Sequence, residues 1–240
     1  MKLAIVTGGS RGLGKALVEH YEGQGWTMLE LSRSGKGAHN FPLDLTDPDA
    51  TLPELEKRFQ TLAETAWERV VFINNAGQLT PIAPVYKLND AQIEHNLAAN
   101  LVSAIRVIAA FVRVFRPTGY PVTIANISSG AALKGYAGWP LYCAAKAGME
   151  NFMRSLAAEC VAADSAVPIT CINIEPGVVD TAMQAEIRSA QPEHFPEHAR
   201  FIGLKESGQL RVPKNVAQTI AAIIADKPEN GGRYRVADYD

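Results

Sequence analysis

The sequence is poor in cysteine and in basic charge. Three cysteines, Cys143, Cys160 and Cys171, occur in 240 residues, and no two of them have Cys-x-x-Cys spacing. An odd number without metal or redox spacing predicts reduced core residues and no metal site. The 23 Lys and Arg residues against 25 Asp and Glu residues give a net charge of −2 at pH 7, without a dense basic run. This balance argues against nucleic acid as a partner.

Long apolar runs are also missing. No uninterrupted stretch approaches the ~18 residues of a membrane span. The chain meets Gly8 and Gly9 before the apolar core of a secretory signal could be completed. We therefore expect no membrane partner and a cytoplasmic protein.

What the sequence does contain is a regular alternation of short apolar runs with segments of helical period. The runs at 3–7, 27–32, 70–74, 122–128, 169–175 and 234–236 predict strands, and those at 11–24, 51–65, 93–115, 141–160 and 213–225 predict helices. With 47% hydrophobic residues, the length suits one domain, residues 1–240. The order predicts a Rossmann-type, doubly wound parallel sheet in three α/β/α layers, with ligands at the carboxyl ends of the strands.

Residues 181–210 break this rhythm. The segment is polar, contains Pro192 and Pro196, and carries His194, His198 and Phe201. Loops of this length are either functional lids or disordered. Its position just after a predicted strand end favours a mobile substrate lid.

A glycine-rich turn follows the first predicted strand and opens the first predicted helix. Such a turn lets backbone N–H groups approach a pyrophosphate, although a merely tight strand-to-helix connection would look similar. Its Thr-Gly-x-x-x-Gly-x-Gly spacing is not the general dinucleotide fingerprint, and it resembles the pattern of short-chain dehydrogenases/reductases. The resemblance implies cofactor contacts from Gly8, Ser10, Arg11, Gly12, Leu13 and Gly14.

The end of the second predicted strand indicates which dinucleotide is bound. NAD enzymes place a carboxylate there for the ribose hydroxyls, whereas a 2'-phosphate needs cations. Ser32 stands where that carboxylate is expected, and Arg33 and Arg11 lie within reach of a phosphate. This favours NADPH/NADP+. Two alternatives stay open: Arg33 is a solvated loop charge, or a register shift of two residues brings Glu30 to the strand end.

Two further turns resemble cofactor contacts of the same family. Asp44 and Leu45 resemble its adenine-contacting turn, although an N-cap or an Asx-turn would also explain Asp44. Asn74 is followed by Asn75, Ala76 and Gly77, an amide-rich turn that ties neighbouring strands together and lines the cofactor ribose in the family.

The pair Tyr142 and Lys146 is the strongest chemical signal. Residues four apart project from one face of a helix. Ketone reduction needs a proton for the developing alkoxide, and a free phenol with a pKa of ~10 is a poorly matched acid near neutrality. A nearby ammonium favours phenolate, so we expect Lys146, in a cleft covered by the cofactor, to supply most of a lowering of the Tyr142 pKa by ~3 units. Ser129 lies 13 residues before Tyr142, the usual interval in the family.

The resemblance assigns roles to this set. Tyr142 is the general acid and also contacts the cofactor, as does Lys146, which binds the nicotinamide ribose. Ser129 bonds to the substrate carbonyl, with Ser128 as the alternative. Asn100 supports a water-linked proton relay to the lysine, and Asn96 is a similar residue one turn earlier. After the sixth strand, a turn resembling the family's nicotinamide-carboxamide site comprises Pro176, Gly177, Val179 and Thr181.

A narrower resemblance concerns the substrate. Residues 138–146, 180–184 and 236–240 resemble sepiapterin reductases and their bacterial relatives, some of which reduce aromatic diketones such as benzil. Trp139 and Met183, with Tyr136, would line a slot for a flat ring, although Trp139 could equally be a packing residue. Sepiapterin reductases anchor the pterin with an acidic residue near the C-terminus. Here the carboxylate is displaced by one position, to Asp238, so a small-molecule ketone or diketone is favoured over a pterin.

Other classes remain as alternatives. These are a 3-oxoacyl thioester reductase and a non-catalytic NADP-sensing protein, although a sensor typically loses the Tyr or the Lys. A sugar-nucleotide epimerase would need a longer C-terminal domain. The apolar stretches 105–115 and 147–156 suit a homodimer or homotetramer interface.

Overall fold

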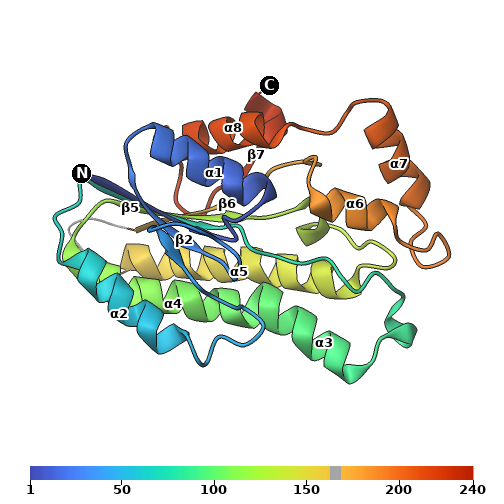
Figure 1. Cartoon of the computed structure of the whole chain (residues 1–240), viewed down its shortest axis with the longest axis horizontal. Coiled ribbons are helices and arrows are strands. Elements are labelled where there is room, and N and C mark those ends of the chain that lie inside the picture. The colour runs from blue at the N-terminus through green and yellow to red at the C-terminus, as the bar shows by residue number, and fades with distance from the viewer. Residues whose placement is uncertain (163–168, 240) are drawn as a thin grey trace.

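The computed structural model describes residues 1–162 and 169–239. Its centre is a single sheet of parallel strands in the order β3-β2-β1-β4-β5-β6-β7 (Figure 1). The strands are β1 (Lys2–Thr7), β2 (Thr27–Leu31), β3 (Asn40–Phe41), β4 (Arg69–Asn74), β5 (Val122–Ile127), β6 (Ile169–Glu175) and β7 (Arg233–Arg235). The predicted Rossmann-type fold is confirmed.

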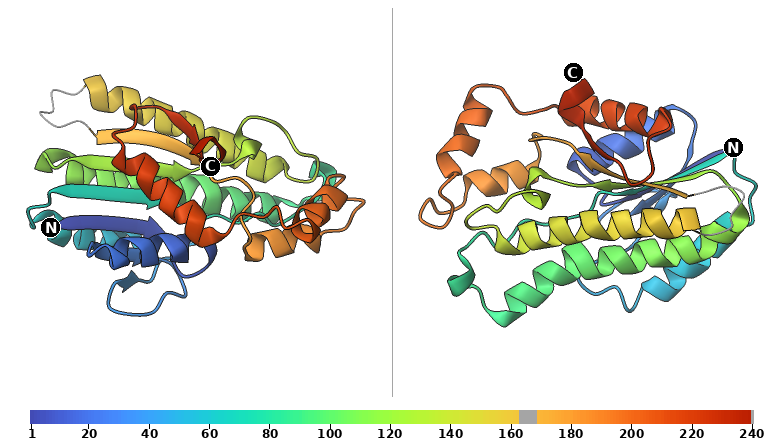
Figure 2. Two further views of the ribbon diagram at one scale, coloured as in Figure 1. Left: turned by 90° about the horizontal axis from the view of Figure 1, so that it is seen from above. Right: turned by 180° about the vertical axis from the view of Figure 1, so that it is seen from behind.

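Helices cover both faces of this sheet. They are α1 (Gly12–Gly23), α2 (Leu52–Ala63), α3 (Asp90–Leu97), α4 (Ser103–Phe115), α5 (Pro140–Ala162), α6 (Ala182–Arg188), α7 (His198–Glu206) and α8 (Pro213–Ala225). Short 3₁₀ turns occur at Val85–Lys87, Arg116–Thr118, Gly130–Ala132 and Val236–Tyr239. Helices α1 and α8 lie on one face and α2, α4 and α5 on the other, while α6 and α7 extend beyond the strand ends (Figures 1 and 2).

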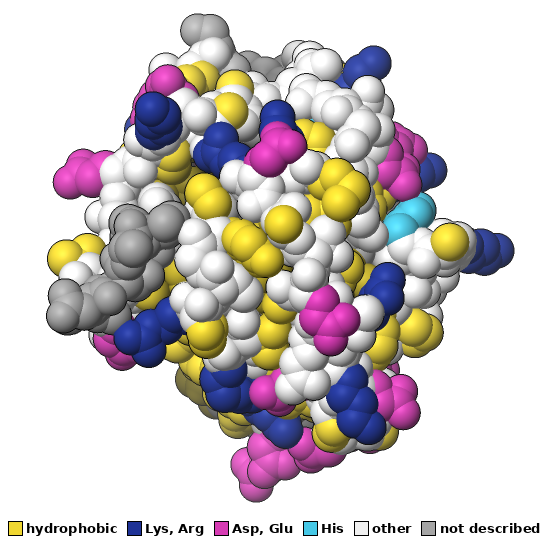
Figure 3. Space-filling view, turned by 90° about the vertical axis from the view of Figure 1, so that its left-hand side faces the viewer, with side chains coloured by type: hydrophobic (Ala, Val, Ile, Leu, Met, Phe, Trp, Pro, Cys, Tyr) yellow, Lys and Arg dark blue, Asp and Glu magenta, His cyan; other side chains and the backbone are white. Residues whose placement is uncertain are grey.

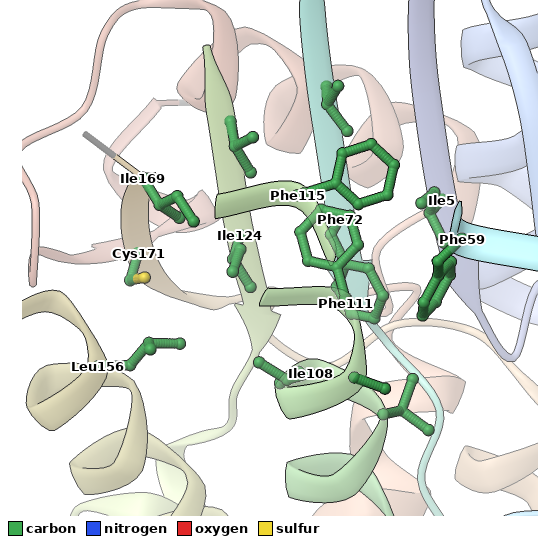
Figure 4. Close-up of a cluster of buried hydrophobic side chains, with 14 of the residues drawn as sticks. Ile5, Phe59, Phe72, Ile108, Phe111, Phe115, Ile124, Leu156, Ile169 and Cys171 are labelled. Atoms are coloured by element: carbon green, nitrogen blue, oxygen red, sulfur yellow. The ribbon is translucent and has the colours of Figure 1, made fainter. Parts of the chain in front are cut away.

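The two faces of the sheet bury two apolar cores. Strands covered on both faces are apolar at nearly every position, which explains why they appear as short continuous runs in the sequence. Below the sheet, Phe59, Phe72, Phe111 and Phe115 form an aromatic cluster (Figure 4). The other core lies between the sheet and α1 and α8. Together these cores hold the strand ends in fixed positions.

The strand order reverses between β1 and β4, because the chain first builds outward through β2 and β3 and then returns to the other side of β1. At such a switch point, the loops that follow the two central strands diverge and leave a crevice at their carboxyl ends. The glycine-rich turn after β1 and the Asn75 turn after β4 therefore flank the same opening.

The helix predicted at 93–115 is interrupted. It begins earlier, at Asp90, and residues Ala98–Val102 form a π-helical turn between α3 and α4. Hydrophobic periodicity detects the helix, but the extra residue of a π turn leaves no periodic signal. Such turns occur often at functional sites, and this one carries Asn100.

The helical stretch Asp90–Thr118 is long and apolar enough, by length and composition alone, to cross a membrane. Charged residues such as Arg106 and Arg113 interrupt it, so it leaves no uninterrupted apolar run in the sequence. Its residues Phe111 and Phe115 are buried against the sheet. The stretch therefore packs as a core helix, and core helices can be as long and apolar as a membrane span.

The end of the molecule that carries the N-terminus shows acidic and basic side chains interspersed among apolar ones (Figure 3). The terminal ammonium of Met1, for example, pairs with Glu68 at 2.7 Å. On this face the charges form no continuous basic patch.

Candidate active site

A cleft of about 830 Å³ runs along the carboxyl ends of the strands, a volume typical of small-molecule sites. All the predicted cofactor residues line it, together with Ser129, Trp139, Tyr142, Lys146 and Met183. Asn100 is not one of the lining residues, although its neighbour Ala99 is. The fold thus brings together residues from turns that are far apart in the sequence.

Steric contacts explain the glycines of the turn after β1. Gly8 has a φ of 69°, a conformation that disfavours side chains. A Cβ on Gly14 would lie 2.1 Å from the carbonyl oxygen of Gly8, so only glycine lets α1 start against the turn. The Nδ2 of Asn75 donates to the carbonyls of Thr7 (3.0 Å) and Gly8 (3.3 Å). The loop is a rigid cradle at the start of a helix, as a pyrophosphate requires.

Substituting Gly14 with alanine should therefore damage cofactor binding. We expect Gly14→Ala to weaken dinucleotide binding about tenfold or more, which corresponds to about 1.4 kcal/mol, as measured by fluorescence titration. Gly23→Ala is the matched control, because Gly23 ends the same helix and its Cβ would meet nothing within 4 Å. Equal effects of the two substitutions would contradict the steric argument.

At the end of β2, the carboxylate considered as an alternative points away from the cleft. Glu30 is buried beneath Gly9, where a Cβ would lie 2.5 Å from its Cγ, and its Oε2 accepts from Asn40 Nδ2 at 2.5 Å. Ser32 and Arg33 line the cleft instead. Ser34 donates to Ser10 at 3.2 Å across the opening. Hydroxyls and guanidinium groups thus face the space beyond β2.

Asp44 forms the Asx-turn that the sequence left open as an alternative. Its Oδ1 accepts from the backbone N–H (2.9 Å) and hydroxyl (2.7 Å) of Thr46, and Oδ2 lies 3.7 Å from Arg33 Nη1. Partial burial raises the pKa of this carboxyl, but the hydrogen bonds from Thr46 and the charge of Arg33 outweigh it and lower the pKa. Asp44 thus also holds Arg33 at the cleft.

Asparagines tie the central strands together, as the amide-rich turn predicted. Asn74 donates to Asn126 at 2.9 Å, and Asn126 donates to Asn173 at 2.8 Å, so three neighbouring strands are joined by buried amides. The Thr7 hydroxyl accepts from the backbone N–H groups of Asn75 and Ala76, both at 2.9 Å. This network fixes the floor of the cleft.

Tyr142, Lys146 and Ser129 meet in the cleft. Tyr142 and Lys146 are both 7% exposed and lie one turn apart near the start of α5. The Lys146 ammonium donates to the carbonyl of Ile127 at 2.7 Å and lies 5.6 Å from the centre of the Tyr142 ring. Ser129 lies close enough to Tyr142 for its hydroxyl to lower the pKa of the phenol, whereas the hydroxyl of Ser128 donates to Glu150 at 2.5 Å. The geometry therefore favours Ser129 over Ser128.

The expected acidification of Tyr142 by Lys146 is not what the structure shows. Burial raises the pKa of Tyr142 to about 12, against the lowering effect of the Ser129 hydroxyl. Burial also lowers the pKa of Lys146 to about 8, against the charge of Glu150. The prediction concerned a cleft covered by the cofactor, whereas these pKa values are those of the protein alone. Both sit in the same poorly solvated space, and the ammonium is bonded to a carbonyl rather than to the phenol.

Asn100 is held in the π-helical turn by three side-chain hydrogen bonds. Its Oδ1 accepts from the N–H of Gln78, and its Nδ2 donates to the carbonyl of the same residue, both at 2.8 Å. Nδ2 also donates to Asn96 Oδ1 at 3.0 Å, and Asn96 donates to the carbonyl of Thr80 at 2.8 Å. A Cβ on Gly77 would lie 3.4 Å from Asn100 Oδ1 and 3.9 Å from Lys146 Nζ. The two amides thus fix the segment that separates Asn100 from Lys146.

The segment predicted as a lid is helical. Helices α6 and α7 occupy it, and Phe195 and Phe201 pack on Trp139 with ring centres 4.6 and 5.4 Å away. Trp139 thus combines the two roles that the sequence left open, since it packs in this cluster and also lines the cleft. Met183, from α6, lines the cleft as well. The segment lines one side of the cleft and packs in an aromatic cluster, and its action as a mobile substrate lid stays a prediction.

Asp238 is not brought to the cleft. Its side chain is 57% exposed, lies 3.7 Å from Arg235 Nη1, and is not part of the lining. The short 3₁₀ turn Val236–Tyr239 buries Val236 instead, which turns the carboxylate outward. Sequence counting missed Glu175 and Arg200, which do line the cleft. The sequence does hint at Glu175, because this charged residue ends an otherwise apolar strand. Nothing in the sequence around Arg200 indicates that it lines the cleft.

Known proteins share this architecture. The family model for short chain dehydrogenases matches residues 2–192. The benzil reductase ((S)-benzoin forming) of Bacillus subtilis is 33% identical over 244 residues, covering 100% of both chains. That of Bacillus cereus is 32% identical and covers 93% of this chain and 94% of its own. The crystal structure of a short-chain dehydrogenase/reductase from Saccharomyces cerevisiae, 24% identical, superposes with a TM-score of 0.83 over 98% of this chain and 96% of that one.

The fold, the phosphate cradle and these matches define an oxidoreductase that uses a nicotinamide dinucleotide. The chain belongs to the short-chain dehydrogenase/reductase family, and its curated relatives place it beside the benzil reductases.

Proposed function

We propose that this protein is an NADPH-dependent carbonyl reductase that converts a ketone or vicinal diketone to an alcohol. The observation that carries the proposal is the meeting of Tyr142, Ser129 and Lys146 in the cleft that also contains the phosphate cradle. A reduced nicotinamide supplies the hydride when it is bound there. The protein must then place the carbonyl, supply a proton and exclude water.

Ser129 and Tyr142 act on the carbonyl oxygen. Both hydroxyls donate hydrogen bonds to it, which stabilises the negative charge that develops as hydride arrives. Tyr142 then gives up its proton to the alkoxide. A phenol whose pKa is raised to about 12 is a weak acid but stays protonated at neutral pH, so the proton is in place for the alkoxide and the group is poorly suited to accept one. This favours reduction over alcohol oxidation.

Lys146 stabilises the phenolate left on Tyr142, because its ammonium lies beside the ring in a poorly solvated site. Its remaining N–H groups are free to bind the ribose of the dinucleotide. Asn100 supports the return of a proton. Its Oδ1 keeps one lone pair beyond the bond with Gln78 and lies on the far side of Gly77 from Lys146, so a water-linked path between them is short.

The turn after β6 orients the nicotinamide. Gly177 has a φ of 76°, and Thr181 begins α6 so close to the phosphate cradle that a Cβ on Gly12 would lie 3.1 Å from its Cγ2. Pro176 and Val179 line the same part of the cleft. Backbone groups of this turn would hold the carboxamide and so decide which face of the ring is presented to the substrate.

The choice of NADPH rests on Arg33, Arg11 and Ser32. We expect Arg33→Ala to weaken NADPH binding about 10- to 100-fold, as for the loss of a charge-assisted hydrogen bond, and to change NADH binding much less. The substitution also releases Asp44, whose carboxylate would repel a phosphate. Isothermal titration with both cofactors measures the difference. Arg113→Ala, which removes an exposed ion pair with Glu56, is the control, and equal losses for NADPH and NADH would refute the assignment.

The substrate end of the cleft suits an aromatic ketone. Tyr136 and Trp139 lie with ring centres 4.9 Å apart, and Met183 lines the same space, so a flat ring would meet apolar surface beside the reacting carbonyl. Benzil and related diketones fit this description. The absence of Asp238 from the lining removes the feature that would anchor a pterin.

A panel of carbonyl compounds tests the proposal. The loss of NADPH absorbance is followed with benzil, sepiapterin and a 3-oxoacyl thioester. We expect the highest kcat/KM with benzil. Preferential reduction of the thioester would instead indicate a 3-oxoacyl reductase, and tight NADPH binding without reduction of any carbonyl would indicate a sensor.

We further propose that the protein acts in the cytoplasm as a homo-oligomer. Ile105 and Val112 of α4 and Phe152 of α5 are only partly buried in the single chain. Side by side on one face of the molecule (Figure 2), these helices offer an apolar surface that a second copy would cover.

A further inference from the structure

We propose that Glu175 is a specificity-determining residue, which accepts a hydrogen bond from a hydroxyl or N–H group next to the reacting carbonyl of the substrate. The preferred substrate would then be an aromatic ketone with such a donor on the adjacent carbon, such as an α-hydroxyketone. This inference rests on the proposed reductase function and adds a substrate class to it.

Glu175 places a carboxylate in the cleft. It is the last residue of β6, directly before Pro176, and its side chain is 21% exposed. Oε2 accepts from Arg233 Nη2 at 2.7 Å, and Oε1 has no hydrogen-bond partner among residues 1–162 and 169–239. One oxygen is thus fixed by the protein and the other is open to the cleft.

The open oxygen lies over the turn that begins with Ser129. A Cβ on Gly130 would lie 3.6 Å from Glu175 Oε1 and 3.8 Å from the hydroxyl of Tyr136. Since Ser129 lies close to Tyr142, this space adjoins the place proposed for the reacting carbonyl. A group on the carbon next to that carbonyl would extend over Gly130.

A partly buried network of ion pairs fixes the position of Glu175 relative to Ser129. Arg233 Nη2 also lies 3.5 Å from the carbonyl of Ser129, and its Nε donates to Glu150 at 2.9 Å. Glu150 is 1% exposed and accepts from Ser128 as well. Arg233 therefore fixes the distance between the Glu175 carboxylate and the two serines.

The chemistry follows from charge. A carboxylate attracts an O–H or N–H donor through a charge-assisted bond and repels the lone pairs of a bare carbonyl or ether oxygen. Glu175 Oε1 is bonded to none of the described residues and is not among their buried unpartnered atoms, so solvent reaches it. A substrate donor would complete its bonding.

The test compares 2-hydroxyacetophenone with 2-methoxyacetophenone, which differ in the donor. Their kcat/KM ratio with NADPH is measured for the wild type, for Glu175→Gln and for Glu186→Gln. Glu186→Gln is the control, because it removes another carboxylate that lines the cleft. We expect the wild type to prefer the hydroxyketone, Glu175→Gln to lower the ratio about tenfold, and Glu186→Gln to leave it unchanged. Glu175→Asp, which keeps the charge but withdraws the carboxylate by one methylene group, should also lower the ratio and serves if Glu175→Gln does not fold.

The possible results distinguish failure of the role of Glu175 from failure of the reductase function. A ratio that stays the same in both Glu175→Gln and Glu175→Asp overturns the inference while leaving the reductase function intact. A ratio that falls equally in Glu186→Gln also overturns it, because a general effect of charge would then suffice. If the wild type reduces neither ketone nor any member of the carbonyl panel, the proposed function itself fails.

Discussion

Tyr142→Phe is expected to lower kcat for ketone reduction by about 10²- to 10⁴-fold, the usual contribution of a general acid. The substitution removes only the hydroxyl, so the ring keeps its packing against Trp139, whose centre is 6.1 Å away. NADPH affinity should stay within about twofold, because the phosphate cradle is built from other residues. Steady-state kinetics and fluorescence titration measure the two quantities separately.

The control for this experiment is Tyr120→Phe. Tyr120 donates to the carbonyl of Ala63, on the α2 side of the sheet, and its substitution removes the same atom far from the cleft. Near-normal turnover by Tyr142→Phe would contradict the assignment of the proton donor. A loss of NADPH binding in the same variant would mean that the hydroxyl is needed for the structure of the site.

The second large effect is expected at Lys146. Reduction requires its ammonium, and burial lowers its pKa from 10.5 to about 8. The kcat/KM for reduction should therefore be constant below pH 8 and fall about tenfold per pH unit above it. Lys146→Met should lose at least about 100-fold in kcat/KM at pH 7 and lose this limb of the profile. A wild-type profile that stays flat to pH 10 would contradict the role of Lys146.

The ammonium of Lys146, which reduction requires, destabilises the folded state. Its folded pKa lies below its unfolded value, so protonation disfavours the folded state. This cost is fully present below pH 8 and disappears as pH rises towards 10.5. A depression of this size corresponds to about 3 kcal/mol, and the lost bond to the Ile127 carbonyl offsets about 1 kcal/mol. Lys146→Met should therefore stabilise the fold by about 2 kcal/mol at pH 7. Destabilisation in urea denaturation would contradict this prediction.

Local patterns predicted much of the fold and the cofactor part of the site. Buried parallel strands leave continuous apolar runs, and steric demands at Gly8 and Gly14 leave a fixed spacing. Tyr142 and Lys146 share a helix face because four residues make about one turn. These relations need no knowledge of distant contacts, which is why they could be predicted from the sequence.

The remainder depended on contacts between distant segments. Whether Glu30 or Ser32 faces the cleft is decided by how β2 meets Gly9 and Asn40. Asp238 turns outward because Val236 is buried under α8, and Glu175 becomes part of the site because Arg233, on another strand, holds it. The pKa of Tyr142 rises because the fold buries it, a quantity that no spacing of residues reveals.

The central claim is that this site delivers hydride and a proton to a ketone. Its most direct test is the product formed from benzil and NADPH that carries deuterium on the transferable position of the nicotinamide. We predict an alcohol with deuterium on the carbinol carbon from the wild type, and at least about 100-fold less of it from Tyr142→Phe in the same time. Tight NADPH binding with no deuterated alcohol from benzil or any other carbonyl of the panel would contradict the account.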